Sequence, residues 1–224
     1  MSPIATGRRA RAHSRAPSRS KRRSGRAGRG RPVRRVAALV LAGVLATGAL
    51  ALAGGYGPFD EAVREIVLPL KYEDIIRQQA EDKDLDAALI AAVIYEESRF
   101  EDRTSPAGAR GIMQITPETA RFIARKSGGS AFVLGDLATP QVNIAYGSWY
   151  LRYMTALYDG DETLAVAAYN AGETNVDRWV AAAGGIDEFD PETDIPFPET
   201  RDYVRDVAEK RELYRERYER ELGL

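Results

Sequence analysis

Two neighbouring glutamates, Glu96 and Glu97, stand at the end of a segment that is otherwise apolar. The segment is typical of a helix, and at about 100° per residue Glu97 falls between Val93 and Ile94, on the face that should meet the core. Glu96 falls about 100° further round, at the edge of that face, where it can reach water. The pattern therefore predicts one buried and one accessible carboxyl group, with Glu97 as the buried one.

A carboxyl group held in a core is a candidate general acid. Its ionised form is costly there, so burial should raise its pKa. An acid that keeps its proton near neutral pH can protonate a leaving oxygen, which is what the acid of a glycosidase does. The structural alternative is a glutamate that pairs with an arginine or caps a neighbouring helix, and this helix alone does not decide between the two.

Composition narrows the chemistry further. The 224 residues include no cysteine, and the single histidine, His13, lies in a basic N-terminal tail. A disulfide framework, a cysteine nucleophile, a thiolate or imidazole metal site and a Ser-His-Asp triad are therefore excluded from the body, as is an acylated-cysteine anchor. Acid–base work falls to Asp, Glu, Lys or Tyr, and no metal or other cofactor is expected.

The elements that must position the glutamates are predicted to be almost all helical, because helix caps recur and strand-like alternation is absent from the sequence. Asp84 or Asp86 can cap the helix that carries the glutamates, and Thr116 and Thr139 each precede a proline at a first helical position. Gly172 suits a left-handed helix end. The expected helices cover residues 72–82, 85–100, 117–127, 140–158, 162–171 and 199–224. The acidic, Gly- and Pro-rich residues 180–198 are expected to form a loop beside a cleft.

The N-terminal part differs in charge from the rest. Of the 32 Lys and Arg, thirteen lie in residues 1–35, which contain no acid, so the rest of the chain holds 19 against all 33 Asp and Glu. Residues 36–53 carry no charge, and eighteen residues at about 1.5 Å each reach roughly 27 Å, enough to span a hydrocarbon core. The positive-inside rule then leaves the tail in the cytoplasm and sends the body outward.

These features predict four parts of the chain. They are a disordered Arg-rich tail over 1–35, a transmembrane anchor over 36–55, a spacer over 56–71 and one globular helical domain over 72–224. A cleaved signal peptide is the alternative for the apolar segment, and secretion would then follow.

Four segments follow the glutamates in order: SPAGARGIMQITPETA at 105–120, NIAYGSWYL at 143–151, AYNAG at 168–172 and IPFPETRDYV at 195–204. With them, the body resembles the soluble-type lytic transglycosylase family, whose SLT domain is similar to goose lysozyme. The resemblance covers nearly all of the body and none of residues 1–71. It implies an all-α fold of the lysozyme-like superfamily and cleavage of the β-1,4 bond between N-acetylmuramic acid and N-acetylglucosamine in peptidoglycan.

The resemblance also implies a mechanism and a set of site residues. Glu97 matches the family's catalytic glutamate, in agreement with the helical-wheel argument. It would protonate the glycosidic oxygen and then take the proton of the sugar's own C6 hydroxyl, which leaves an anhydromuramic end. Gly108 and Gly111 would let the backbone approach the sugar, and the Tyr169 hydroxyl would reach Glu97 or the acetamido group. The substrate-binding residues implied by the matching positions are Ser98, Met113, Gln114, Tyr169, Asn170 and Glu199.

Structural interpretations stand beside these roles. Ser98 can cap a turn, Tyr169 and Asn170 can simply end a helix, and Glu199 can be a first-turn acid favoured by the helix dipole. The aromatic residues Tyr146, Trp149, Tyr150 and Tyr153 are expected in the core rather than as a sugar platform. A calcium site is conceivable, but the spacing lacks the glycine and closing glutamate of an EF-hand, which favours a solvated loop. The ligands of such a calcium site would come from Asp187, Glu188, Asp190, Glu192 and Asp194.

The function predicted from the sequence is a membrane-tethered lytic transglycosylase. Its expected partners are peptidoglycan glycan strands, the membrane through one N-terminal helix, and anionic lipid headgroups at the Arg-rich tail, whereas no nucleic-acid partner is expected. Two alternatives remain at this point. One is a goose-type muramidase that hydrolyses the same bond, and the other is a catalytically silent glycan-binding scaffold.

Overall fold

The computed structural model describes residues 67–129 and 131–224, which lie within one compact unit of the chain. The tail expected over 1–35 and the membrane segment expected over 36–55 lie outside the described residues. Within the described ranges no strand forms, and the extended contacts are isolated bridges of Arg110 with Thr104 and Ile115. None of the helices in these ranges is long and apolar enough to cross a membrane. The prediction of an all-α body is confirmed for this part of the chain.

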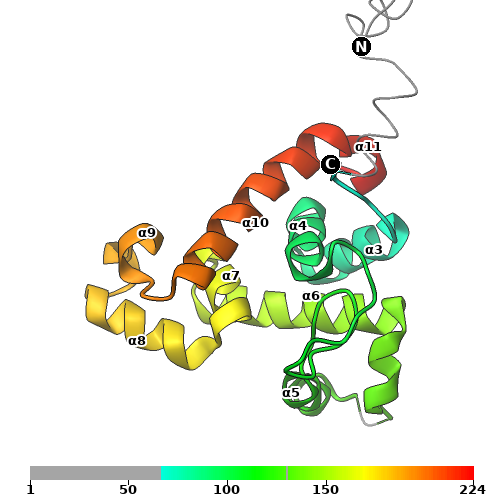
Figure 1. Cartoon of the computed structure of the whole chain (residues 1–224), viewed down its shortest axis with the longest axis horizontal. Helices are drawn as coiled ribbons and strands as arrows, with labels where there is room; N and C mark the ends of the chain where they lie inside the picture. The colour runs from blue at the N-terminus through cyan, green and yellow to red at the C-terminus, as the bar shows by residue number, and fades with distance from the viewer. Residues whose placement is uncertain (1–66, 130) are drawn as a thin grey trace, which may run out of the picture. The chain divides into compact units, whose positions relative to one another are not determined.

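The helices follow one another through short connections (Figure 1). They are α3 (Glu73–Lys83), α4 (Ala87–Ser98), α5 (Pro117–Ser127), the 3₁₀ helix η1 (Leu134–Ala138), α6 (Pro140–Leu157), α7 (Glu162–Ala171), α8 (Glu173–Ala183), the 3₁₀ helix η2 (Ile186–Glu188), α9 (Pro191–Asp194), α10 (Pro198–Arg217) and α11 (Glu219–Leu222).

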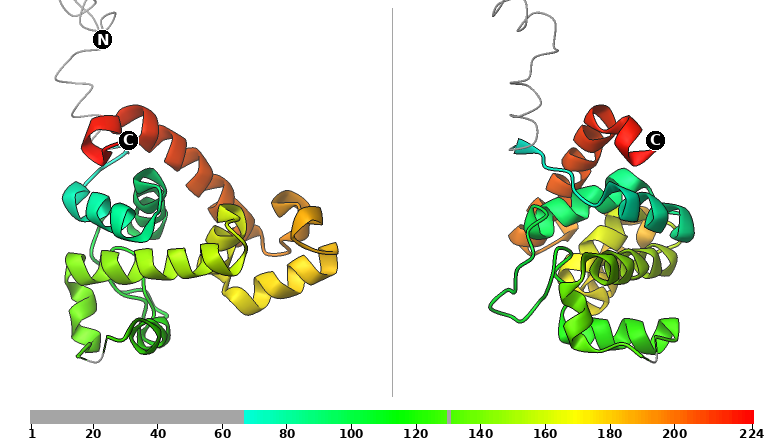
Figure 2. Two further views of the ribbon diagram at one scale, coloured as in Figure 1. Left: turned by 180° about the vertical axis from the view of Figure 1, so that it is seen from behind. Right: turned by 90° about the vertical axis from the view of Figure 1, so that its right-hand side faces the viewer.

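Helix α4, which carries the two glutamates, is covered on all sides. Its cap is Asp86, whose side chain accepts a hydrogen bond from the Ala88 N–H at 2.9 Å. Residues 87–95 are all buried, so the helix has no solvent face over this length. Figures 1 and 2 show α3 beside it, α10 passing across it and the long α6 on its other side. The apolar sequence of α4 reflects this central position.

The glutamate-bearing helix ends at Ser98, two residues earlier than the sequence predicts. Arg99 and Phe100 both take left-handed backbone angles, with φ of 55° and 63°. This conformation is unfavourable for residues other than glycine, and here the burial of the Phe100 ring, which is 2% exposed, offsets its cost. The sharp end turns the chain away from the core into the loop 101–116.

Helix α10 is held against α4 by ion pairs at one end. The Asp86 carboxylate, 7% exposed, accepts a hydrogen bond from the Arg215 guanidinium at 2.9 Å and pairs with Arg211 as well. Arg211 also reaches Glu162 of α7 at 2.7 Å. Burial alone would raise the pKa of Asp86, but the hydrogen bonds from the two arginines outweigh it and lower that pKa. One capping residue therefore connects three helices.

The folded body begins earlier than the predicted boundary at residue 72. Leu68 is 2% exposed and belongs to the core. Its carbonyl accepts a hydrogen bond from the Tyr218 hydroxyl at 2.6 Å, and the Pro69 carbonyl accepts one from the Tyr214 hydroxyl at 2.6 Å. The last residues of the expected spacer are thus part of the domain.

The expected loop over residues 180–198 is partly helical, which corrects the prediction. Helix α8, which was not expected, runs on into this segment, and η2 and α9 lie within it. Gly172, expected at a left-handed helix end, has φ 85° and ψ 145° and joins α7 directly to α8. A single extended glycine lets one helix follow the other at once, so no loop signal separates them.

Candidate active site

The carboxyl group of Glu97 lies at the C-terminal end of α4, where it meets Tyr203 of α10. The Tyr203 hydroxyl donates a hydrogen bond to Glu97 Oε1 at 2.8 Å. From the loop that follows α4, the Arg103 guanidinium donates to the Glu97 backbone carbonyl. The packing of α10 on α4 therefore places a neutral donor directly on this carboxyl group.

Burial raises the pKa of Glu97 from 4.5 to about 7. The hydrogen bond from Tyr203 and the positive charge of Arg103 act in the opposite direction, and the negative charge of Glu96 adds to the increase. A pKa near 7 means that much of the population carries the proton at neutral pH. Glu97 can therefore act as an acid and, after giving up its proton, as a base.

Glu96 is less accessible than the sequence predicts. Its side chain is 19% exposed and lies 3.8 Å from Nζ of Lys210 on α10. That ammonium also lies 5.3 Å from the centroid of the Tyr95 ring. Burial raises the pKa of Glu96, and the Lys210 charge opposes this increase. The two glutamates thus face different residues of the same partner helix.

The loop that faces α4 is pinned by Asn143 of α6, a residue to which the sequence assigned no role. Its side-chain oxygen accepts from the Met113 N–H at 2.8 Å, and its amide donates to the Arg110 carbonyl at 2.9 Å and to the Leu137 carbonyl at 3.1 Å. A Cβ at Gly111 would lie 2.1 Å from the same amide nitrogen. The missing side chain of Gly111 therefore makes room for Asn143, and the expected approach of its backbone to the sugar stays a prediction.

Met113 and Ser98 are buried in this loop contact rather than exposed to a cleft. The Met113 side chain is fully buried, and a Cβ at Gly147 of α6 would lie 2.3 Å from its sulfur. The Ser98 hydroxyl lies 2.6 Å from the Ile112 carbonyl oxygen and is 1% exposed. Neither side chain is free to contact a ligand in this structure, so both support the loop against α4.

Tyr169 and Asn170, at the end of α7, also bond within the protein. The Tyr169 hydroxyl donates to the Met113 carbonyl at 2.9 Å, whereas a contact with Glu97 or the substrate had been expected. Burial raises the pKa of Tyr169 well above its ordinary value, and the charge of Glu97 acts in the same direction. Asn170 accepts a hydrogen bond from the Thr200 hydroxyl of α10 at 2.9 Å. These contacts fix the end of α7 beside α10.

Gln114 is half-buried in its loop, whereas Glu199 is exposed at the start of α10. Gln114 takes a left-handed φ of 47°, and its amide donates to the carbonyls of Gly111 at 2.7 Å and Arg103 at 3.0 Å. Its side-chain nitrogen therefore shapes the loop, and the substrate contact implied for Gln114 stays a prediction. Glu199 is exposed in the first turn of α10, one turn before Tyr203.

The aromatic side chains of α6 form a partly buried cluster, in agreement with a core role. The Trp149 and Tyr153 rings stack with centroids 5.5 Å apart, and Tyr146 stacks on Phe132 at 4.6 Å. Tyr150 differs from the others because it also lines a pocket, and it approaches Tyr169 with ring centroids 5.5 Å apart.

The acidic segment after α8 uses its carboxylates for capping. Asp190 accepts from the Glu192 N–H at 2.9 Å, and Asp194 accepts from the Asp190 N–H at 2.9 Å. Across the ranges that the structure describes, no group of three or more acidic or histidine side chains is placed to hold a metal ion.

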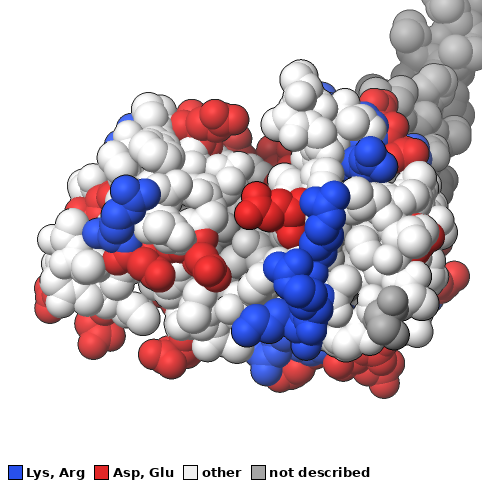
Figure 3. All heavy atoms as spheres, turned by 90° about the horizontal axis from the view of Figure 1, so that it is seen from below, with Lys and Arg blue, Asp and Glu red and all other residues white. Residues whose placement is uncertain are grey.

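Tyr203 is the site residue that sequence reasoning missed. It lies within the segment IPFPETRDYV, four residues after Glu199 and so on the same side of α10. That spacing was available as a signal, but nothing in the sequence says which residue of α10 meets α4. Figure 3 shows one face of the molecule, where acidic side chains border a hollow and a column of basic side chains lies beside it.

Comparison with known proteins gives one consistent family. The sequence model of the transglycosylase SLT domain matches residues 74–190. The soluble lytic murein transglycosylase of Escherichia coli K12 is 34% identical over 150 residues, which is 66% of this chain and 23% of that protein. The membrane-bound lytic murein transglycosylase F of Alcanivorax borkumensis is 36% identical over 112 residues, which is 47% of this chain and 22% of that protein.

The structural comparison agrees. The 70 kDa soluble lytic transglycosylase of Escherichia coli superposes with a TM-score of 0.64 at 32% identity, over 68% of this chain and 25% of that one. The chain therefore spans about a quarter of the length of the relatives that it matches.

Proposed function

The chain belongs to the transglycosylase SLT domain family, and on that basis we propose that it is a peptidoglycan lytic transglycosylase. The substrate would be the β-1,4 bond between N-acetylmuramic acid and N-acetylglucosamine, and the product an anhydromuramic end. The observation that supports this most directly is the Glu97 carboxyl group, partly buried, hydrogen-bonded to Tyr203 and with its pKa raised to about 7.

Glu97 performs both proton transfers in this proposal. As an acid it gives its proton to the glycosidic oxygen while the bond from that oxygen to C1 of the muramic sugar breaks. The 2-acetamido group stabilises the positive charge that develops at C1. The carboxylate then takes the proton of the C6 hydroxyl, and O6 forms the new bond to C1. No water enters the products, and a pKa near 7 suits a group that must act in both directions.

The surrounding residues divide into positioning and contact roles. Tyr203 orients the carboxyl group and stabilises its ionised form. The Tyr169 hydroxyl bonds to the Met113 carbonyl and the Ser98 hydroxyl to the Ile112 carbonyl, so both hold the loop in place. We assign these two side chains and that of Met113 to support of the site. Substrate contacts are proposed for three polar residues, the half-buried Gln114 and the exposed Asn170 and Glu199.

We propose that the body lies outside the cytoplasmic membrane. The support is the sequence of residues 1–53, in which a basic tail precedes an uncharged segment long enough to span a bilayer. Cell fractionation with N-terminal sequencing of the mature chain tests this. Recovery in the membrane fraction with the apolar segment intact supports an anchor, release of a shortened chain supports a signal peptide, and recovery in the cytoplasm contradicts both.

The activity is tested by mass spectrometry of purified peptidoglycan after digestion by the full chain. Anhydromuramic ends support the proposal, whereas reducing ends that have gained water identify the hydrolase. Binding without release of fragments identifies the scaffold. Glu97→Gln should abolish release while retaining glycan binding, and Glu96→Gln is the matched control, because it makes the same change one residue away and should keep activity.

A further inference from the structure

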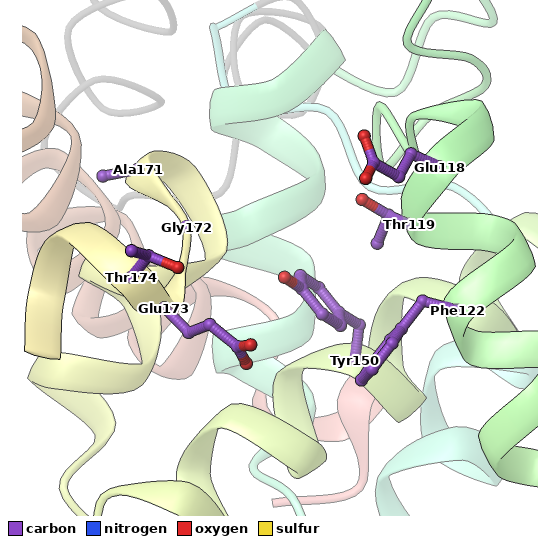
Figure 4. A pocket seen from close by; sticks show the side chains of 8 residues that line it. All are labelled: Glu118, Thr119, Phe122, Tyr150, Ala171, Gly172, Glu173 and Thr174. Carbon is purple, nitrogen blue, oxygen red and sulfur yellow. The ribbon is translucent and has the colours of Figure 1, made fainter.

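A pocket of about 330 Å³ opens between α5, α6 and the junction of α7 with α8. This volume lies at the lower end of the range of ligand-binding pockets, about 300–1,000 Å³. Figure 4 shows its walls: Glu118 and Thr119 project from α5 on one side, Glu173 and Thr174 from α8 on the other, and the Tyr150 side chain lies between them.

The two acidic side chains of this pocket pair with no basic side chain among residues 67–129 and 131–224. Within the described residues, neither the Glu118 nor the Glu173 carboxylate makes an ion pair or a hydrogen bond, whereas Glu162 and Asp86 are both paired with arginine. Each glutamate lies in the first turn of its helix, where the helix dipole favours a negative charge. The dipole explains an acid at either position, but it does not require that both face one cavity. Together they make the cavity unfavourable for anions.

The floor of the pocket is aromatic. Phe122 and Tyr150 pack edge to face with ring centroids 6.4 Å apart. One turn further along the same face of α5, the Lys126 ammonium lies 5.9 Å from the Phe122 centroid, so this ring already accepts a cation from the protein. The Tyr150 hydroxyl makes no hydrogen bond to any described residue, and Figure 4 shows it directed into the cavity. Burial, together with the nearby charge of Glu173, raises the pKa of Tyr150 to about 12, so this hydroxyl remains a donor.

The pocket is linked through Tyr150 and Tyr169 to the loop that packs against the end of α4, the helix of Glu97. Tyr150 approaches Tyr169 at 5.5 Å between ring centroids, and the Tyr169 hydroxyl bonds to the Met113 carbonyl, in the loop that packs against the end of α4 at Ser98. Gly172, which lines the pocket, immediately follows the helix that carries Tyr169. A polymer held at Glu97 would therefore place a neighbouring group near this pocket.

We propose that this pocket binds a primary ammonium group displayed by the cell-wall polymer, held by the carboxylates of Glu118 and Glu173 over the rings of Tyr150 and Phe122. This inference rests on the proposed function for the identity of the polymer. An ammonium with an aliphatic or sugar body satisfies both carboxylates, the free hydroxyl and the aromatic floor, whereas an acetylated amine has no charge to offer them. Two sources carry this group: an amino sugar that lacks its acetyl group, and the amine of a stem-peptide side chain.

The test measures binding to the full chain by calorimetry, which does not depend on cleavage. One arm compares glucosamine oligomers with N-acetylglucosamine oligomers of the same length. The other compares amine-bearing stem peptides attached to a muramic sugar with the same peptides after N-acetylation. We expect the free amine to bind about three- to tenfold more tightly in at least one arm, the effect of two partly exposed ion pairs, and the preference to fall as salt rises. The arm that responds identifies the source.

Matched variants locate the preference. Glu118→Gln and Glu173→Gln should each reduce it, and the double variant should remove it. The control is Glu73→Gln, because Glu73 also occupies the first turn of an 11-residue helix, α3, but does not line the pocket. Equal binding of amine and acetylated ligands in both arms, or a preference that survives in the double variant, overturns the proposal. An amine preference without any cleavage would instead leave the pocket assigned and contradict the proposed function.

Discussion

Replacing Tyr203 by phenylalanine removes the hydroxyl that donates to Glu97 Oε1 at 2.8 Å and leaves the ring that packs between α10 and α4. That hydrogen bond lowers the pKa of Glu97, against the increase that burial causes. Without it the carboxyl group should hold its proton to higher pH. The variant therefore separates the orienting role of the hydroxyl from the bulk of the side chain.

The magnitude follows from the contact. A hydrogen bond to a charged group contributes about 1.5–3 kcal/mol, and one pH unit corresponds to about 1.4 kcal/mol. Because Glu97 is partly exposed, water can replace some of the lost interaction, so we expect a change of about one pH unit rather than two. Activity requires the protonated acid and so falls as pH rises through the Glu97 pKa. In Tyr203→Phe this alkaline limb should move upward from about 7.

The assay is the pH dependence of kcat/KM, which reports ionisations of the free enzyme. Release of soluble muropeptides from purified peptidoglycan provides the rate. Tyr158→Phe is the control, since that hydroxyl bonds to Asp177 at 3.0 Å instead of the site, and its profile should match the wild type. An alkaline limb that stays in place or moves downward in a folded Tyr203→Phe variant would refute the assignment of Tyr203 and the acid role of Glu97 together.

Three further substitutions test the packing and charge of the site. Glu97→Gln should raise the free energy of unfolding at pH 8 by about 1–3 kcal/mol, because the wild-type protein must then bury an ionised carboxylate and the variant a neutral amide. The stability that the raised pKa provides to the wild type is present below pH 4.5 and is lost as pH rises through about 7, so denaturation at about pH 4 should show almost no difference between the two proteins. Glu96→Gln removes a negative charge that raises the Glu97 pKa, so the alkaline limb of kcat/KM should move slightly downward, and an upward movement would contradict this role of the Glu96 charge. Gly147→Ala should destabilise the fold by about 1–3 kcal/mol in thermal denaturation, because its Cβ would lie 2.3 Å from the Met113 sulfur, whereas Gly135→Ala, with open space around it, should cost little.

Local signals in the sequence predicted most of the helices correctly. Caps at Asp86 and Thr116 act as expected, with side-chain oxygens that accept from N–H groups of the first turns, whereas the Thr139 side chain makes no such bond at the start of α6. Such caps are short-range interactions, so the residues that make them lie close together in the sequence. The helix after Gly172 was not predicted, because a helix that follows another without a loop provides no local boundary signal.

The division of Glu96 and Glu97 into an accessible and a buried residue succeeded only in part. A helical wheel assumes one apolar face, but α4 is buried over residues 87–95 in every direction. Both glutamates are consequently half-buried, and what distinguishes them is the residue of α10 that each one meets, Lys210 or Tyr203. A helical wheel contains only the residues of one helix, so it cannot predict which residues of α10 meet α4.

The sequence by itself determined the helical class of the body, the family motifs and the presence of a carboxyl group in an apolar helix, because these depend on residues close together in the chain. Tertiary structure alone decided that Tyr203 bonds to Glu97, that Asn143 holds the loop at Gly111, and that Glu118 and Glu173 face one pocket. Each of these pairs lies 30 or more residues apart, and only the packing of whole helices fixes which side chains meet across such separations.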